Sequence, residues 1–211
     1  MIKYIRFAAA PTLTALGAFF ALQGEHWMWV YFAMFAIIVI LGDFTLGDNS
    51  ENPKYPSTKI LNFLLYINFP FLILAVIASI WMVGDYPIPE WGSSFAIARE
   101  NTTLYDLVGY VIVMGLLVAS AGTNVGHELT HRKKNKFDMF LGNWFLAFTW
   151  DCAFAIEHVY GHHKYVATER DPATARRGQN PYSFIFRSTI LSHRNAWVIE
   201  NNRLKKQGHN P

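Results

Sequence analysis

The most prominent pattern in the chain is a series of long apolar runs separated by short polar stretches. Five such segments cover residues 7–22, 27–46, 60–83, 104–121 and 137–156. A helix that crosses a bilayer needs about 20 mostly apolar residues, so the second to fifth segments are long enough and the first is marginal. The pattern therefore predicts an all-α, polytopic membrane helical bundle, and we expect residues 1–211 to form a single membrane domain.

The first apolar segment follows Lys3 and Arg6, an arrangement that is also typical of a secretory leader. No good small-residue cleavage site comes before the polar stretch 23–26, and the next apolar segment starts at once. We therefore interpret residues 7–22 as the first arm of a helical hairpin.

Composition favours a membrane location over the alternative, a soluble bundle of apolar helices. Charged residues make up 16% of the chain, whereas soluble domains carry about 25%. The single cysteine, Cys152, lies in an apolar stretch, which excludes a disulfide framework and disfavours a cysteine-based metal site.

The distribution of basic residues predicts how the chain is oriented, because an excess of Lys and Arg marks the cytoplasmic side. Lys3 and Arg6 precede the first segment, and four basic residues lie within 132–136. The loop 84–103 carries only Arg99 against three acidic residues. We expect a multi-pass membrane protein, with its amino terminus and residues 132–136 on the cytoplasmic side and the loop 84–103 on the opposite side.

The net charge of +3 is modest, and the basic residues form short clusters instead of a continuous stripe. This distribution suits anionic lipid or an acidic protein partner, and it argues against nucleic acid as a partner. Residues 157–211 are expected to form a cytoplasmic region, which includes an amphipathic helix at about 187–206.

The stretch "NVGHELTHRKK" contains a motif with metal-binding spacing. His127 and His131 are four positions apart, so on a helix both rings project from one face, one turn apart. The pattern H-E-x-x-H is a common two-histidine metal grip, and Glu128 lies beside the first ring.

The stretch "IEHVYGHHKYVATERDP" contains a second histidine cluster, with His158 and His162 again four positions apart and His163 directly after. On a helix His163 would point about 100° away from His162, so one of the two rings could bind a second metal or bridge to the next helix. The two clusters supply five nitrogen donors, whereas a zinc site takes three or four protein ligands. Imidazole also suits iron, which makes redox chemistry plausible. His26, His193 and His209 are interpreted as ordinary polar residues.

The two clusters share a site only if the intervening apolar segment is not a simple crossing. His131 and His158 are 27 positions apart, and a continuous helix would separate them by about 40 Å. Asn143, Trp150 and Asp151 interrupt the apolar character of residues 137–156. We therefore predict a re-entrant, broken or interfacial segment there.

These two stretches resemble the first two histidine boxes of the membrane-bound alkane 1-monooxygenases, a branch of the membrane fatty acid desaturase and hydroxylase superfamily. The stretch "GDFTLGDNSENP" at 42–53 is similar to an Asp-rich segment of that family. "FRSTILSHRNAWVIENNRL" is similar to the basic helix that follows its second box. The resemblance extends over about residues 30–205.

The resemblance implies a non-haem di-iron centre held almost wholly by histidines, and O₂-dependent hydroxylation of the terminal methyl of medium-chain alkanes to primary alcohols. It also implies a location in the bacterial cytoplasmic (inner) membrane, where a rubredoxin with its reductase delivers electrons at the cytoplasmic face. The substrate remains open among alkanes, fatty acids, ethers and alkyl aromatics.

The resemblance also assigns residues. The iron ligands would be His127, His131, His158, His162 and His163. Glu128 and Glu157 stand beside ligands, and they are candidates for carboxylates that orient the histidine rings. The basic residues of 132–136 and of the helix 187–206 are candidates for docking an acidic electron carrier.

Members of the family continue through another spanning helix and further histidine clusters, one of them of the form "HSDHH". This chain ends at "GHNP" without such a cluster, so we expect an amino-terminal fragment of a longer reading frame. The alternative is a truncated, catalytically inactive relative that keeps the fold and part of the metal site. A third reading is an intramembrane zinc protease in which Glu128 acts as general base.

Overall fold

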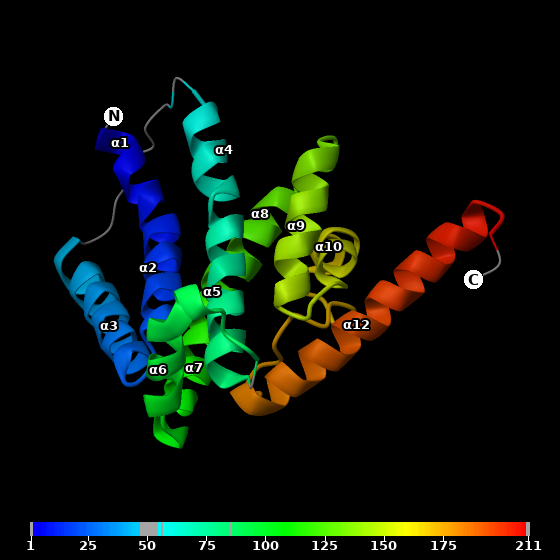
Figure 1. Ribbon diagram of the computed structural model, residues 1–211. Helices are drawn as coiled ribbons and strands as arrows, with labels where there is room; N and C mark the ends of the chain where they lie inside the picture. Colours follow the sequence, from blue (N-terminus) through cyan, green and yellow to red (C-terminus); the bar gives the residue numbers. More distant parts are fainter. Residues whose placement is uncertain (1, 47–54, 56, 85, 210–211) are drawn as a thin grey trace. The chain divides into compact units, whose positions relative to one another are not determined.

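The structure is a computed structural model that describes residues 2–46, 55, 57–84 and 86–209 (Figure 1). The secondary structure assigned among these residues is entirely helical. The chain divides into two compact units, Met1–Val125 and Gly126–Pro211. Most of the Asp-rich stretch singled out in the sequence, residues 47–53, lies outside the described part of the chain.

The first unit contains a series of helices in the order in which the apolar segments occur. They are α1 (Ile2–Ile5), η1 (Arg6–Ala8), α2 (Ala9–Gln23), α3 (Trp27–Leu46), α4 (Lys59–Tyr66), α5 (Asn68–Val83), η2 (Glu90–Gly92), α6 (Ser93–Asn101), α7 (Leu104–Leu117) and the π-helical turn η3 (Val118–Thr123).

Helices α2, α3, α5 and α7 contact one another and enclose the core of the first unit. Four alanines, Ala18 and Ala21 on α2 and Ala75 and Ala78 on α5, are buried there. Small residues let helix backbones approach closely, which is how helices associate where lipid removes the hydrophobic driving force. The larger core side chains come from α3, α5 and α7, and they are Met28, Tyr31, Met82, Tyr110, Val113 and Leu117.

Polar groups in this core are satisfied within the protein. The Tyr31 hydroxyl donates to the Leu13 carbonyl at 3.0 Å, and the Tyr110 hydroxyl donates to the Ala21 carbonyl at 2.6 Å. An unpaired polar group in a bilayer costs several kcal/mol, because the hydrocarbon contains no water with which it could form a hydrogen bond. These bonds therefore connect α3 and α7 to α2, and they offset the free-energy cost of burying the two hydroxyl groups.

Three helices among the described residues are long and apolar enough to cross a membrane: Trp27–Thr45, Lys59–Val83 and Leu104–Thr130. The outward side chains of α3 are apolar as well, and Phe44 at its end is 88% exposed. Such surface is unfavourable in water and expected in lipid. The all-α membrane fold predicted from the sequence is thus confirmed, with three candidate spans instead of the four segments that are long enough in the sequence.

The second unit carries the histidine clusters. Its elements are the end of α8 (Asn124–Thr130), α9 (Lys136–Phe148), α10 (Phe154–Glu157), the π-helical turn η4 (His158–His162), α11 (His163–Tyr165) and α12 (Pro181–Lys206).

The fifth apolar segment is broken, as the sequence predicted. Helix α9 begins at the Asn135 cap, whose side chain accepts the backbone N–H groups of Phe137 and Asp138. The helix ends at Phe148, and Trp150 then adopts a left-handed conformation with φ 58° before α10 starts. A turn of this kind cannot continue an α-helix, so the chain changes direction where the sequence interrupts its apolar pattern.

Helices α8 and α9 approach closely because glycines face each other. A Cβ added at Gly142 would lie 3.1 Å from the Thr130 side chain and 3.2 Å from the Gly126 carbonyl oxygen. A Cβ at Gly126 would lie 2.9 Å from Leu146 and 3.1 Å from the Gly142 carbonyl oxygen. The missing side chains allow the backbones to touch, and the chain folds back beside the first histidine motif.

Helix α12 is longer than the predicted amphipathic helix at 187–206. It begins at Pro181, directly after the Asn180 cap, whose side chain accepts the N–H groups of Tyr182 and Ser183. Proline at the first helical position costs no hydrogen bond, because that N–H has no partner within a helix. Helix α12 contacts α10 and η4, so it supports the second histidine cluster from one side (Figure 1).

Candidate metal centre

Four histidines of the second unit direct one ring nitrogen each toward a common point. The candidate ligand atoms of His127, His131, His158 and His163 all lie within 4.8 Å of one another. The Nε2 atom of His127 is 2.8 Å from that of His131 and 2.8 Å from that of His158. The Nε2 atom of His163 is 3.1 Å from that of His158. We refer to these four residues as the four-histidine group.

The second cluster contributes its rings through a π-helical turn. In η4 (His158–His162) the backbone winds more loosely than an α-helix, so residues five apart come near the same face. This turn brings His163, not His162, to the Nε2 atom of His158. The ring of His162 instead stacks on that of His158, with ring centroids 5.3 Å apart and planes inclined by 16°.

The close approach of these nitrogens is best satisfied by a cation. A neutral imidazole nitrogen carries either one proton or one lone pair in the ring plane. The Nε2 atom of His127 therefore cannot form hydrogen bonds to both His131 and His158, although each lies 2.8 Å away. A metal ion at the point of convergence would accept all the lone pairs at once.

The separations between these nitrogens also fit a single metal ion. A nitrogen ligand lies about 2.0–2.1 Å from a first-row ion such as zinc, so two nitrogens are about 2.9 Å apart at a right angle and about 3.4 Å apart at the tetrahedral angle. The three observed separations are 2.8, 2.8 and 3.1 Å. They are of the size expected for neighbouring nitrogen ligands of one first-row ion.

The surroundings of His158 keep its ring neutral and oriented. Burial lowers the pKa of His158 to about 4, and the neighbouring histidines add to the effect, His127 first. Neutral imidazole is the form that binds metal. The Phe154 ring stacks on His158 with centroids 4.6 Å apart and meets the edge of His127 at 5.6 Å, so one aromatic side chain packs against both motifs.

One side of the four-histidine group faces solvent. His131 and His163 are exposed, whereas His127 and His158 are partly buried. His131 also lines a surface hollow together with Arg132, Lys133, Lys134, Asn135 and Asp138, and we call its three basic residues, Arg132, Lys133 and Lys134, the basic rim. The Lys133 ammonium lies 4.3 Å from the centre of the Tyr160 ring, a cation–π contact that holds this side chain beside the second cluster.

The fifth candidate ligand, His162, lies outside the four-histidine group and has its own partner. Its Nδ1 atom is 2.9 Å from Oδ2 of Asp171, which is buried. Burial alone would raise the pKa of Asp171, but hydrogen bonds from the Thr174 hydroxyl, the Ala173 N–H and His162 outweigh it and hold this pKa below its usual range. Nothing in the spacing of the sequence indicated this contact, because it depends on the path of the loop between η4 and α12.

The two glutamates beside the histidines have other partners. Glu128 is exposed and accepts hydrogen bonds from the Arg132 guanidinium, the shorter at 2.9 Å. Glu157 is buried and accepts from the Asn195 side chain at 3.1 Å. Burial raises the pKa of Glu157, and the Asn195 bond partly offsets this rise. Their proposed role in orienting the histidine rings stays a prediction.

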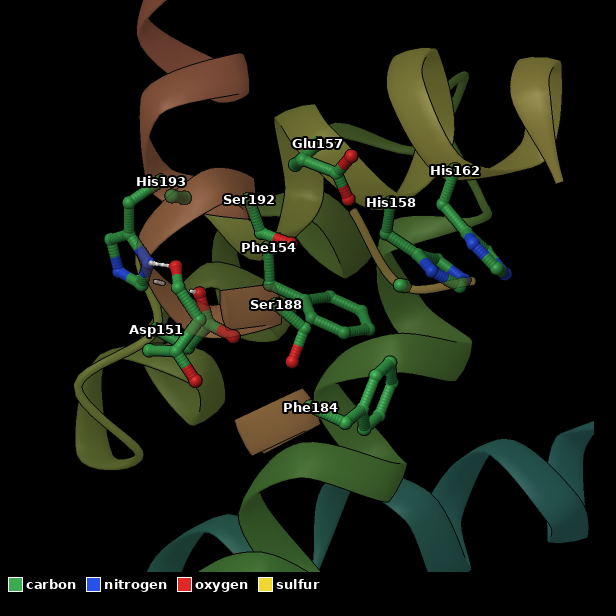
Figure 2. A pocket seen from close by; sticks show the side chains of 12 residues that line it. Asp151, Phe154, Glu157, His158, His162, Phe184, Ser188, Ser192 and His193 are labelled. Atoms are coloured by element: carbon green, nitrogen blue, oxygen red, sulfur yellow. Dashed lines mark hydrogen bonds and ion pairs between the residues drawn. The ribbon is translucent and has the colours of Figure 1, made fainter. Parts of the chain in front are cut away.

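A cavity of about 340 Å³ lies beside the second cluster, between α10, η4 and α12 (Figure 2). Phe154, His158 and His162 line one part of it, and Asp151 and His193 line another. The His193 Nδ1–H donates to the Thr189 carbonyl at 2.9 Å, and its Nε2 atom is 3.9 Å from Asp151. His193 is thus engaged within α12 and is not a member of the four-histidine group, in line with its interpretation from sequence.

Comparison with known proteins agrees with this site. The family model described as fatty acid desaturase matches residues 103–209, about half of the chain and all of the five candidate ligands. An alkane 1-monooxygenase of Pseudomonas putida is 31% identical over 201 residues, which cover 92% of this chain and 44% of the relative. An alkane 1-monooxygenase of Ectopseudomonas oleovorans is 34% identical over 196 residues, 92% of this chain and 44% of the relative.

A third relative has a different printed activity. The xylene/toluene monooxygenase hydroxylase component of Pseudomonas putida is 27% identical over 207 residues, 98% of this chain and 52% of the relative. The chain thus spans about half the length of the curated relatives it matches. With its helical membrane fold, its four converging imidazoles and a family match that covers both histidine motifs, the chain belongs to the fatty acid desaturase family.

Proposed function

We propose that this chain is part of a membrane monooxygenase that uses O₂ to hydroxylate the terminal methyl group of medium-chain alkanes or related alkyl substrates. The observation that supports this proposal most directly is the convergence of four Nε2 atoms at separations that fit ligands of a metal ion. The names of the relatives support the reaction class, since seven of them are alkane 1-monooxygenases and one is a xylene/toluene monooxygenase component.

The proposed reaction balances with two electrons and two protons from outside the substrate. One oxygen atom of O₂ enters the methyl C–H bond to give a primary alcohol, and the other leaves as water. A bound non-haem di-iron centre would supply the oxygen activation. In this chain it would be held by His127, His131, His158, His162 and His163, and the whole protein would complete it.

The residues of this chain would prepare the site for that chemistry. Burial and mutual repulsion keep the His158 imidazole neutral, so its lone pair is available at neutral pH. Phe154 packs against the rings of His127 and His158 and fixes their orientation. The alkyl substrate would be bound by burial of its methylene groups, each worth about 0.8 kcal/mol.

The electron donor would be a rubredoxin, itself reduced by its reductase. The basic rim at Arg132, Lys133 and Lys134 lines the same hollow as the exposed His131, so an acidic carrier bound there would be close to the metal. The same basic residues support a cytoplasmic orientation of the site, in a bacterial inner membrane, because Lys and Arg accumulate on that side.

The direct test is conversion of octane to 1-octanol by membranes that contain the protein, supplied with rubredoxin, its reductase and NADH. We expect alcohol formation and bound iron in the wild type, and loss of both in His127→Ala and in His158→Ala. His26→Ala is the matched control, because His26 lies in a turn of the first unit and contacts Glu25 and Trp27. It should keep both iron and activity.

Each other result identifies an alternative. Turnover retained in His127→Ala or His158→Ala would refute the ligand assignment. Zinc in place of iron would favour the metalloprotease reading. Iron that depends on the histidines but supports no oxidation of any alkyl substrate would identify a non-catalytic relative.

A further inference from the structure

His162 has the features of a metal ligand but does not belong to the four-histidine group. Its ring is nearly parallel to that of His158, at 16°, and the two rings point the same way in Figure 2. Its Nδ1 atom lies 2.9 Å from Asp171, which leaves Nε2 as the nitrogen that could bind a metal. In the four-histidine group, too, the converging atoms are Nε2.

Asp171 determines which nitrogen of His162 carries the proton. Its carboxylate accepts the Ala173 N–H at Oδ1 and the Thr174 hydroxyl at Oδ2, in addition to the His162 contact. An ionised carboxylate can only accept hydrogen bonds, so the proton of the pair belongs on Nδ1 of His162. The lone pair is then on Nε2, the arrangement seen when a carboxylate supports a metal-binding histidine.

The loop that carries Asp171 is braced at several points. The Ala167 N–H donates to Thr174 Oγ1 at 2.9 Å, and Ala167 itself has a left-handed φ of 64°. From α12, the Arg187 guanidinium donates to the Thr174 carbonyl at 2.8 Å. Because helix and loop hold Asp171 in place, its position is set before any metal binds.

We infer that Asp171 is a positioning residue that presents Nε2 of His162 to a second metal position, distinct from that of the four-histidine group. This inference rests on the proposed di-iron function. It assigns different tasks to adjacent histidines: His163 completes the group around His127 and His158, and His162 serves the neighbouring ion. The stacking of His158 on His162 places the two ligand sets side by side.

The test is a titration of the purified, metal-free protein with Co²⁺, followed by its visible absorption, with thermal stability measured in parallel. In the wild type we expect two classes of bound Co²⁺. His162→Ala should remove one class. Asp171→Ala should weaken the same class by about 10–100-fold, the usual cost of losing a carboxylate behind a metal-binding histidine. The double variant should then behave like His162→Ala alone.

Two further variants separate positioning from loop structure. Asp171→Asn keeps an oxygen that can accept the Nδ1–H, so it should bind Co²⁺ between the wild type and Asp171→Ala. Thr174→Val removes the hydroxyl that braces the loop but leaves the carboxylate and the imidazole. It should lower the melting temperature while keeping both Co²⁺ classes within a few-fold of wild type.

The outcomes distinguish this inference from the proposed function. If His127→Ala and His158→Ala abolish one Co²⁺ class but Asp171→Ala leaves the other unchanged, the metal centre stands and the positioning role is wrong. Equal losses in Thr174→Val and Asp171→Ala would also overturn it, because the carboxylate would then act only on the loop. If no Co²⁺ class depends on any of the histidines, the proposed function itself fails.

Discussion

The Nε2 atom of His158 lies 2.8 Å from the Nε2 atom of His127, although 31 positions separate the two residues. Two structural features allow this approach. The fifth apolar segment breaks at Trp150, and Gly126 and Gly142 let α8 and α9 touch backbone to backbone. The metal site thus depends on residues that provide no ligand.

We predict that Gly142→Ala destabilises the second unit and weakens metal binding. The new methyl group would lie 3.0 Å from the Leu129 Cβ and 3.2 Å from the Gly126 carbonyl oxygen, so the two helices must separate. Overpacking of this kind costs about 1–3 kcal/mol. The measurements are the melting temperature and the iron content of the purified protein.

Gly115→Ala is the matched control for this substitution, because a Cβ at Gly115 would have no neighbour within 4 Å among the residues that the structure describes. It should leave the melting temperature unchanged or raise it, since alanine favours a helix over glycine by about 1 kcal/mol. Equal behaviour of the two variants would refute the role of the close contact.

We predict that Phe154→Ala lowers the metal affinity while the protein still folds. The substitution removes the ring that stacks on His158 and meets the edge of His127, so both imidazoles gain freedom that binding must then restrict. Aromatic pairs contribute about 0.5–1.5 kcal/mol beyond their burial, so the affinity should fall by a few-fold to about tenfold. Isothermal titration of the metal-free protein measures this.

Phe186→Ala provides the comparison, because Phe186 lies on α12 and is 72% exposed. Its metal affinity should equal that of the wild type. A wild-type affinity in Phe154→Ala as well would show that helix packing alone orients the rings.

The basic rim leads to a prediction about electron transfer. Charge reversal in Lys133→Glu/Lys134→Glu should raise the KM for rubredoxin by about tenfold or more at low salt, because steering by charge changes association rates by about 10–10³. Turnover with a small uncharged reductant should not change. The pair Lys205→Glu/Lys206→Glu, at the end of α12, makes the same change in net charge in the other candidate docking segment, the helix 187–206. We expect the smaller effect there, because the basic rim lines the same hollow as the exposed His131. Equal effects of the two pairs would contradict the assignment of docking to the basic rim.

Asp151 gives a prediction about pH. Burial raises the pKa of Asp151 above its ordinary value of 3.8, with His193 and the backbone N–H of Phe154 opposing the rise. The folded state therefore binds this proton more readily than the unfolded state, and the free energy of unfolding falls as the pH rises through the two values. Asp151→Asn cannot ionise, so it should not show this fall in the free energy of unfolding. Its melting temperature should match that of the wild type near pH 4 and exceed it increasingly toward pH 7, whereas a difference independent of pH would contradict the argument.

Much of the fold follows from the sequence because lipid imposes simple rules. The segment 27–46 becomes α3 with the same bounds, and the segment 60–83 lies within the span Lys59–Val83. The length of an apolar run is enough to predict such helices, since backbone groups in a bilayer must pair within the segment itself. The break near Trp150 could also be predicted from the sequence, because polar residues interrupt the apolar pattern there.

The histidine spacing by itself determined which residues were candidate ligands, but only the tertiary structure decided how they are grouped. An α-helix would pair His158 with His162, four positions on, and the π-helical turn η4 pairs His158 with His163 instead. That turn is a local departure from regular winding, held by packing against α12, and no spacing rule encodes it. The bond between His162 and Asp171 likewise needs a loop conformation fixed by contacts from α12. The candidate ligands could thus be predicted from local spacing in the sequence, whereas the grouping of their rings depended on contacts between distant segments.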